Sequence, residues 1–93
     1  MSKLQELVNK TKCSIDLSIN MHKDYYQTVK ECIDELGEEE QGEMTDYNIE
    51  KMIKHDTIIR LQLYPHTPIG SYTLYGWDLD ILLDQALRTF DNE

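Results

Sequence analysis

The sequence has no lysine or arginine between residues 31 and 50, although nine residues of that segment are acidic. Over the whole chain, 18 acidic residues stand against nine basic ones, and the formal net charge is -9. Proteins hold nucleic-acid phosphates with lysine and arginine, and anionic lipid surfaces attract basic segments. The charge therefore argues against direct nucleic-acid binding and against a membrane surface, and it favours a basic protein partner.

The low content of proline, glycine and cysteine and the lack of long apolar runs further restrict the kind of protein this can be. The two prolines and four glycines are spread along the chain, so no low-complexity segment is present. No apolar run approaches the roughly 20 residues of a membrane-spanning helix, and the first residues lack the apolar core of a signal peptide. Two cysteines, Cys13 and Cys32, fit no zinc spacing with the three histidines. We expect a cytoplasmic protein with reduced, buried thiols and without a metal or cofactor.

Catalytic motifs are also missing. The chain contains no phosphate-binding loop, dinucleotide-binding glycine cluster, nucleophile elbow or metalloprotease spacing, which favours a protein that is not an enzyme. One alternative remains, a small enzyme or a module that binds a metal or a small ligand through clustered aspartates and a histidine. Its candidate residues are Asp78, Asp80, Asp84 and either His22 or His66. Asp80 and Asp84 share a helix face, but Asp78 is better placed as a helix N-cap.

What the chain does contain is regular hydrophobic patterning, with 40% hydrophobic residues. Alternating apolar positions, typical of half-buried strands, predict strands at residues 13–21, 57–64 and 71–77. Helical spacing predicts four helices, and Asp24, Thr45 and Asp78 are expected as N-caps. We therefore predict a single α+β domain over residues 1–93, in the order α-β-α-α-β-β-α, with the helices packed on one face of a three-stranded sheet.

The same alternation predicts an open, polar face on this sheet. The residues expected there are Asp16, Ser18, Arg60, Gln62, Tyr64 and some of Thr73, Tyr75 and Trp77. The third strand, or the first, should form an edge of the sheet. An edge strand without lysine can pair with a second copy, which predicts a homodimer through a sheet edge.

The most unusual segment is "LGEEEQGEMTDYNIE", residues 36–50. A run of like charge is often a solvated linker, and "EEEQGE" is expected as loop. Clustered charge on a compact domain also costs stability, so it can instead mark a surface that attracts a basic partner. Tyrosines beside it can supply binding energy. The residues predicted to bind a partner are Asp34, Glu35, Glu38, Glu39, Glu40, Glu43, Asp46, Tyr47 and Tyr26; the competing surface is the open face of the sheet.

In these features the chain resembles the small acidic phage-encoded inhibitors of host defence or host machinery, of the anti-restriction and anti-CRISPR type. The resemblance lies in the short length, the charge block "DELGEEEQGEMTDYNIE", the lack of catalytic motifs and the compact α/β pattern. It implies an inhibitor that acts in the host cytoplasm as a nucleic-acid mimic. Such a protein would block the basic site of a nucleic-acid-binding protein or nuclease complex. Toxin-neutralising immunity proteins have the same general character and are the alternative.

Overall fold

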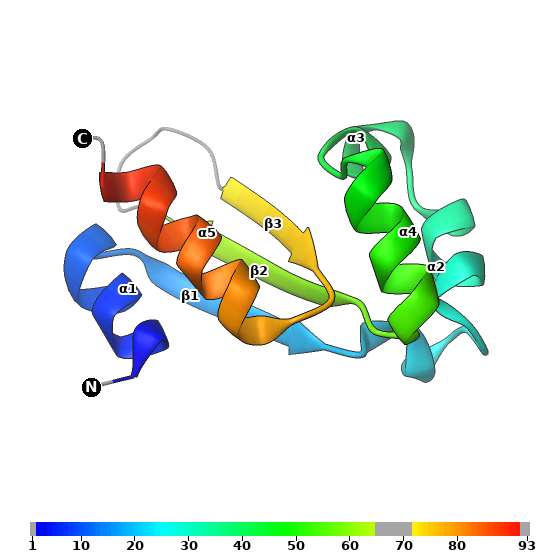
Figure 1. Cartoon of the computed structure of the whole chain (residues 1–93), viewed down its shortest axis with the longest axis horizontal. Helices are drawn as coiled ribbons and strands as arrows, with labels where there is room; N and C mark the ends of the chain where they lie inside the picture. The colour runs from blue at the N-terminus through cyan, green and yellow to red at the C-terminus, as the bar shows by residue number, and fades with distance from the viewer. Residues whose placement is uncertain (1, 65–71, 92–93) are drawn as a thin grey trace.

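The computed structural model describes residues 2–64 and 72–91. Its elements are α1 (Lys3–Thr11), β1 (Ser14–Ile19), the 3-10 helix η1 (Met21–Asp24), α2 (Val29–Glu35), α3 (Glu38–Gly42), α4 (Asp46–His55), β2 (Ile59–Tyr64), β3 (Tyr72–Gly76) and α5 (Leu79–Asp91). The predicted order of helices and strands is confirmed (Figure 1), with α3 and η1 as additions. The expected turn between the second and third strands, with His66, lies outside the described residues.

The three strands form one antiparallel sheet in the order β1-β2-β3, so β2 is the central strand. Leu61 fixes the register, because it lies opposite Leu17 of β1 and opposite Leu74 of β3. Each strand is slightly shorter than its alternating pattern predicted. Since side chains alternate along a strand, this register places all the leucines of the three strands on one face.

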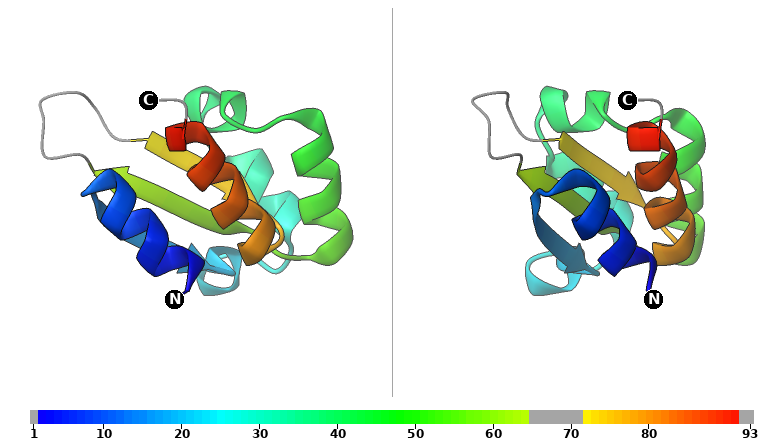
Figure 2. Two further views of the ribbon diagram at one scale, coloured as in Figure 1. Left: turned by 60° about the vertical axis from the view of Figure 1, so that its left-hand side comes forward. Right: turned by 90° about the vertical axis from the view of Figure 1, so that its left-hand side faces the viewer.

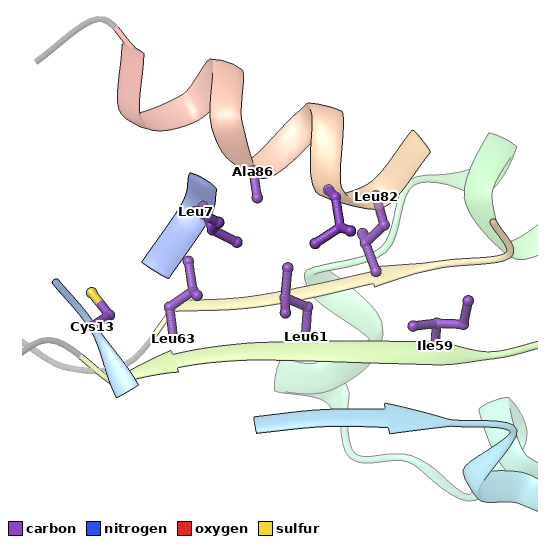
Figure 3. Packing of buried hydrophobic residues seen from close by; sticks show 8 residues of the cluster. Leu7, Cys13, Ile59, Leu61, Leu63, Leu82 and Ala86 are labelled. Atoms are coloured by element: carbon purple, nitrogen blue, oxygen red, sulfur yellow. The ribbon is translucent and has the colours of Figure 1, made fainter. Parts of the chain in front are cut away.

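Helices α1 and α5 cover that face. The buried residues of this first cluster come from both helices, from all odd positions of β2 and from the residue before β1 (Figure 3). They are Leu7, Cys13, Ile59, Leu61, Leu63, Leu82, Leu83 and Ala86. Both helices carry an apolar stripe, and a stripe of this kind must be buried against another apolar surface. The sheet face supplies that surface.

Helices α2, α3 and α4 pack at one end of the sheet, away from α1 and α5 (Figures 1 and 2). They enclose a second cluster, formed by Val29, Cys32, Ile33, Met44, Met52, Ile58 and Tyr75. Of these, Ile58 directly precedes β2 and Tyr75 belongs to β3. The prediction that the helices pack on one face of the sheet therefore holds for α1 and α5 but not for the α2–α4 group, which packs against Tyr75 on the other side of the sheet.

Local capping explains where most helices begin. The hydroxyl of Thr28 accepts a hydrogen bond from the backbone N–H of Glu31, and that of Thr45 accepts one from Asn48. The Asp78 carboxylate accepts one from the N–H of Ile81. Thr45 and Asp78 are the N-caps that the sequence predicted. The prediction for Asp24 was wrong, because that residue ends the 3-10 helix and the next helix starts after Thr28.

Because one side of β2 is buried and the other is not, substitutions on its two faces should differ in their effect on the free energy of unfolding. Leu61→Ala should lower the free energy of unfolding by about 2–5 kcal/mol, because Leu61 is 0% exposed and its removal leaves a cavity in the first cluster. Gln62→Ala, on the opposite face of the same strand, should cost less than about 1 kcal/mol. Urea unfolding of both variants checks this, and equal losses would contradict the assignment of the two faces.

Candidate functional site

We define the acidic lobe as helices α2, α3 and α4 with their connections, residues 29–55. It carries the nine acidic residues of positions 31–50. The side chains of eight of them are described, and all eight are exposed. Those side chains belong to Glu31, Asp34, Glu35, Glu38, Glu40, Glu43, Asp46 and Glu50. The fold therefore brings the predicted acids together on one lobe, and Glu39 also belongs to α3.

The acidic segment is not the loop that its composition predicted. Residues 38–42 form α3, and the side chain of Gln41 holds this helix against the end of α2. The Nε2 of Gln41 donates to the carbonyl of Ile33 at 2.9 Å and to the carbonyl of Leu36 at 3.0 Å. The last carbonyl groups of a helix lack their usual i+4 partners. The amide supplies a partner to the Leu36 carbonyl and a second one to the Ile33 carbonyl, which also accepts from the N–H of Leu36. The result is that the carboxylates of α3 project from a fixed helix.

The acidic side chains of the lobe affect the pKa values of two groups in the second cluster. Burial raises the pKa of the Cys32 thiol, and the negative charge of Glu40 raises it further. Burial likewise raises the pKa of Tyr75; Glu40 and Glu43 add to this effect, while Arg60 opposes it. A nearby negative charge disfavours a second negative charge, so both groups are held in their neutral forms. The acids are thus close enough to the second cluster to act on it electrostatically.

Tyr47 is the aromatic residue at the centre of the acidic sequence, and 60% of it is exposed. Its ring meets Trp77 edge to face, with 5.7 Å between the ring centroids. The ammonium group of Lys51 lies 5.6 Å from the Tyr47 centroid, within the range of a cation–π contact. Trp77 and Lys51 were not among the predicted site residues. They hold the Tyr47 ring in place at the surface while leaving more than half of it accessible.

The second predicted tyrosine has a different environment. Tyr26 is half-buried and packs against the second cluster. Its neighbour Tyr25 is 86% exposed, and the two rings meet edge to face with centroids 6.5 Å apart. The sequence predicted Tyr26 as the exposed member of this pair, and this was wrong, because Tyr26 packs against the second cluster and the Tyr25 ring lies in solvent. Tyr25 is therefore the more accessible aromatic group at this side of the lobe.

Two of the three aspartates of the alternative site already have hydrogen-bond partners within the chain. Asp78 caps α5, and the Asp84 carboxylate accepts a hydrogen bond from Lys3 Nζ at 3.1 Å. This hydrogen bond raises the pKa of Lys3, and the charges of Asp84, Asp80 and Asp78 raise it further. The positive charge of Lys3 thus partly neutralises the aspartates, which is the role that a bound metal ion would otherwise have. Among the described residues, no group of three or more histidine, cysteine or acidic side chains could hold a metal ion.

His22, the other candidate of that site, is completely buried in η1. Its Nε2 lies 3.7 Å from the Asp56 carboxylate, and neither ring nitrogen makes a hydrogen bond within the described part of the chain. The same carboxylate accepts a hydrogen bond from the backbone N–H of Val29 at 3.3 Å. Asp56 therefore connects η1, the start of α2 and the end of α4. In this position His22 has no contact with solvent.

No protein-family model matches the chain, and no curated protein or solved structure matches it either. Within the described residues, no helix is long and apolar enough to cross a membrane. Any functional conclusion must therefore come from the surfaces of the chain itself.

The raised pKa values of Cys32 and Tyr75 predict alkaline sensitivity. Their contribution to stability is complete below the ordinary values of 9.0 and 10.0, and it is lost as the pH rises through the raised pKa of each group. Tyr75→Phe removes one of the two ionisations. Between about pH 8 and pH 11 this variant should lose less unfolding free energy than the unmodified chain. Tyr64→Phe, on the exposed end of β2, should lose as much as the unmodified chain, and urea unfolding at each pH measures the difference.

Proposed function

We propose that this chain is a non-catalytic binding protein, a small acidic inhibitor that occupies a basic, nucleic-acid-handling site on another protein. The observation that carries the proposal is the exposure of eight carboxylates on one lobe of three helices. The ion pair between Lys3 and Asp84 lies outside these eight. The lobe also contains Lys30, Lys51 and Lys54, but its nine acidic residues leave a clear excess of negative charge. A surface with such an excess attracts a partner of opposite charge and speeds its association.

Shape supports the same proposal. A packed set of helices fixes the backbone positions from which the carboxylates project, so the negative charges are distributed over a defined surface, as the phosphates of a nucleic-acid backbone are. A basic groove that accepts phosphates can therefore accept the lobe, and occupation alone blocks the groove. This mode of inhibition requires no bond to be made or broken, which agrees with the lack of recognisable catalytic motifs in the sequence.

Charge alone usually determines the rate and orientation of binding, while affinity depends on a few aromatic or arginine anchors. Tyr47 is suited to this role, because its ring is exposed and already oriented by Trp77 and Lys51. An anchor that is ordered before binding loses less conformational entropy when the complex forms. We assign the centre of the binding surface to Tyr47 and the surrounding rim to the acids.

The partner we infer is a nuclease or another nucleic-acid-binding complex, and the setting is the cytoplasm of a host cell if the chain is phage-encoded. Affinity capture from the native host, followed by mass spectrometry, identifies the partner. Recovery of a basic nucleic-acid-handling protein supports the anti-restriction or anti-CRISPR type of function. Recovery of a secreted toxin would instead support the alternative function, that of a toxin-neutralising immunity protein.

The acidic lobe should control the rate of association. Glu35→Lys combined with Glu43→Lys should slow association with the captured partner about tenfold or more at low salt and flatten the salt dependence. Both residues lie at helix C-terminal ends, where a lysine is favourable to the helix dipole, so the fold should persist. Stopped-flow or surface-binding kinetics at several salt concentrations provide the measurement.

The matched control for this pair is Glu6→Lys combined with Asp80→Lys. It changes the net charge by the same amount, but its exposed positions lie on α1 and α5, outside the lobe. This control should keep most of the association rate and of the salt slope. Equal effects of the two pairs would mean that only total charge matters, and the lobe would lose its assigned role.

Tyr47 should control dissociation. Tyr47→Ala should weaken binding to the captured partner by about 1–3 kcal/mol, mostly through faster dissociation, because the ring is the proposed anchor. Tyr64→Ala is the control, since Tyr64 is also partly exposed, at 42%, but lies on the open face of the sheet. The reverse result, with Tyr64 sensitive and Tyr47 neutral, would move the binding surface from the lobe to that face. Circular dichroism confirms that both variants are folded.

A further inference from the structure

Strand β1 forms the free edge of the sheet. It lies at one rim, and no other described element runs alongside its outer side (Figures 1 and 2). The opposite edge, β3, is partly covered, because the side-chain amide of Asn48 in α4 donates to the backbone carbonyl of Tyr75 at 3.3 Å. Of the two edges that could extend this sheet, the described structure leaves β1 the more open.

The backbone of β1 is ready for pairing. The N–H of Asn20 donates to the carbonyl of Ile58 at 2.9 Å, so the even-numbered residues of β1 direct their backbone groups to β2. Neighbouring residues of a strand point these groups in opposite directions. Ile15, Leu17 and Ile19 therefore direct theirs outward, each with one donor and one acceptor. A row of this kind is a template for another strand.

The side chains of β1 favour the same conclusion. Edge strands are usually protected from pairing by lysine, proline or a bulge. Residues 13–19 contain none of these residue types, and Asp16 is the single charge. Ile19 is 52% exposed at the end of the strand, while Ile15 and Leu17 are half-buried against the first cluster. The strand thus combines unpaired backbone groups with apolar surface that remains in water.

We propose that a second copy of this chain pairs with β1, antiparallel and across a two-fold axis at Leu17, to give a continuous six-stranded sheet. In this register Ile15 of each copy, whose backbone groups point outward, lies opposite Ile19 of the other copy. Strand pairing therefore also covers the exposed Ile19 side chain. Such a dimer does not depend on the acidic lobe having a partner.

Asp16 disfavours one of the two neighbouring registers. Outward-facing residues must meet outward-facing residues, so the register can shift only in steps that keep odd positions opposite odd positions. The shift that centres the axis on Asp16 puts two carboxylates directly opposite each other, which is unfavourable. With the axis at Leu17, each Asp16 instead faces the hydroxyl-bearing Ser18 of the other copy.

The covering helices are compatible with this arrangement. Helix α1 lies near the beginning of β1 (Figure 1), and antiparallel pairing places the two beginnings at opposite ends of the shared ladder. The acidic lobe follows the end of β1 in each copy. The dimer would therefore carry its two acidic lobes at separate ends of the six-stranded sheet, with the binding surface of each still exposed.

Molar mass in solution tests the dimer. Sedimentation or light scattering across the micromolar range should give twice the 11.0 kDa chain mass for the unmodified protein. Ile19→Lys should raise the dissociation constant more than about tenfold, because it removes apolar burial from both copies and adds a charge to the edge. Ile81→Lys is the matched control, since Ile81 is 45% exposed on α5, and it should remain dimeric. A monomeric unmodified chain would overturn the proposal, as would an Ile19→Lys variant that dimerises equally well.

Disulfide trapping tests the register. Two single variants, Asp16→Cys and Ser18→Cys, are mixed and mildly oxidised, with the unmodified chain as control for the native thiols. The mixture should give a cross-linked heterodimer in several-fold higher yield than either variant alone, because residues 16 and 18 are directly opposite only between copies. Such pairs bring their Cβ atoms to about 4.5–5.5 Å, within reach of a disulfide after small adjustment. Predominant cross-linking of Asp16→Cys with itself would overturn this register.

Discussion

Strand β2 joins the two hydrophobic clusters, and the arrangement of the molecule depends on this junction. Ile58 and Ile59 are adjacent and almost completely buried, yet Ile58 belongs to the cluster under the acidic lobe and Ile59 to the cluster under α1 and α5. Ile58 directly precedes β2 and Ile59 is its first residue. Adjacent residues of an extended chain point to opposite sides, so this short segment serves both clusters. The same division occurs on β3, where Leu74 packs in the first cluster and Tyr75 in the second.

This junction explains how three short helices can form an ordered lobe. Helices α2, α3 and α4 have seven, five and ten residues, and helices of this length are marginal in isolation. Their cluster is completed by Ile58 and Tyr75, which the sheet supplies. The lobe therefore depends on the sheet for its position and for part of its core.

Repulsion between the carboxylates of the acidic lobe lowers stability, and two features of the structure limit this loss. Carboxylates concentrated on one lobe repel one another, and Glu40 also opposes ionisation of Cys32 and Tyr75 beneath it. The neutral forms of these two groups avoid a direct conflict at ordinary pH. Gln41 secures α3 through two carbonyl groups, so the helix that bears these carboxylates needs little further ordering when a partner binds. A surface that is ordered in advance is consistent with the inhibitory role that we propose.

The proposed dimer edge and the acidic lobe occupy different parts of the molecule. The edge belongs to β1, whereas the lobe lies beyond the end of that strand (Figure 1). Occupation of one surface therefore leaves the other open. Two lobes carried by one dimer would raise the effective concentration of the second lobe after the first has bound, if the partner presents two sites at a suitable spacing.

Local patterns in the sequence determined the strands, most of the helices and the buried face of the sheet, because alternation and helical spacing depend only on residues close together along the chain. They also identified Thr45 and Asp78 as caps. Tertiary structure alone decided that residues 38–42 form a helix, since Gln41 must reach back to the end of α2. It also decided that Tyr75 is buried: strand alternation places this residue on the open face, and only the helices of the lobe exclude water from it. Such long-range coverage leaves no periodic signal, because the covering residues lie tens of positions away in the chain.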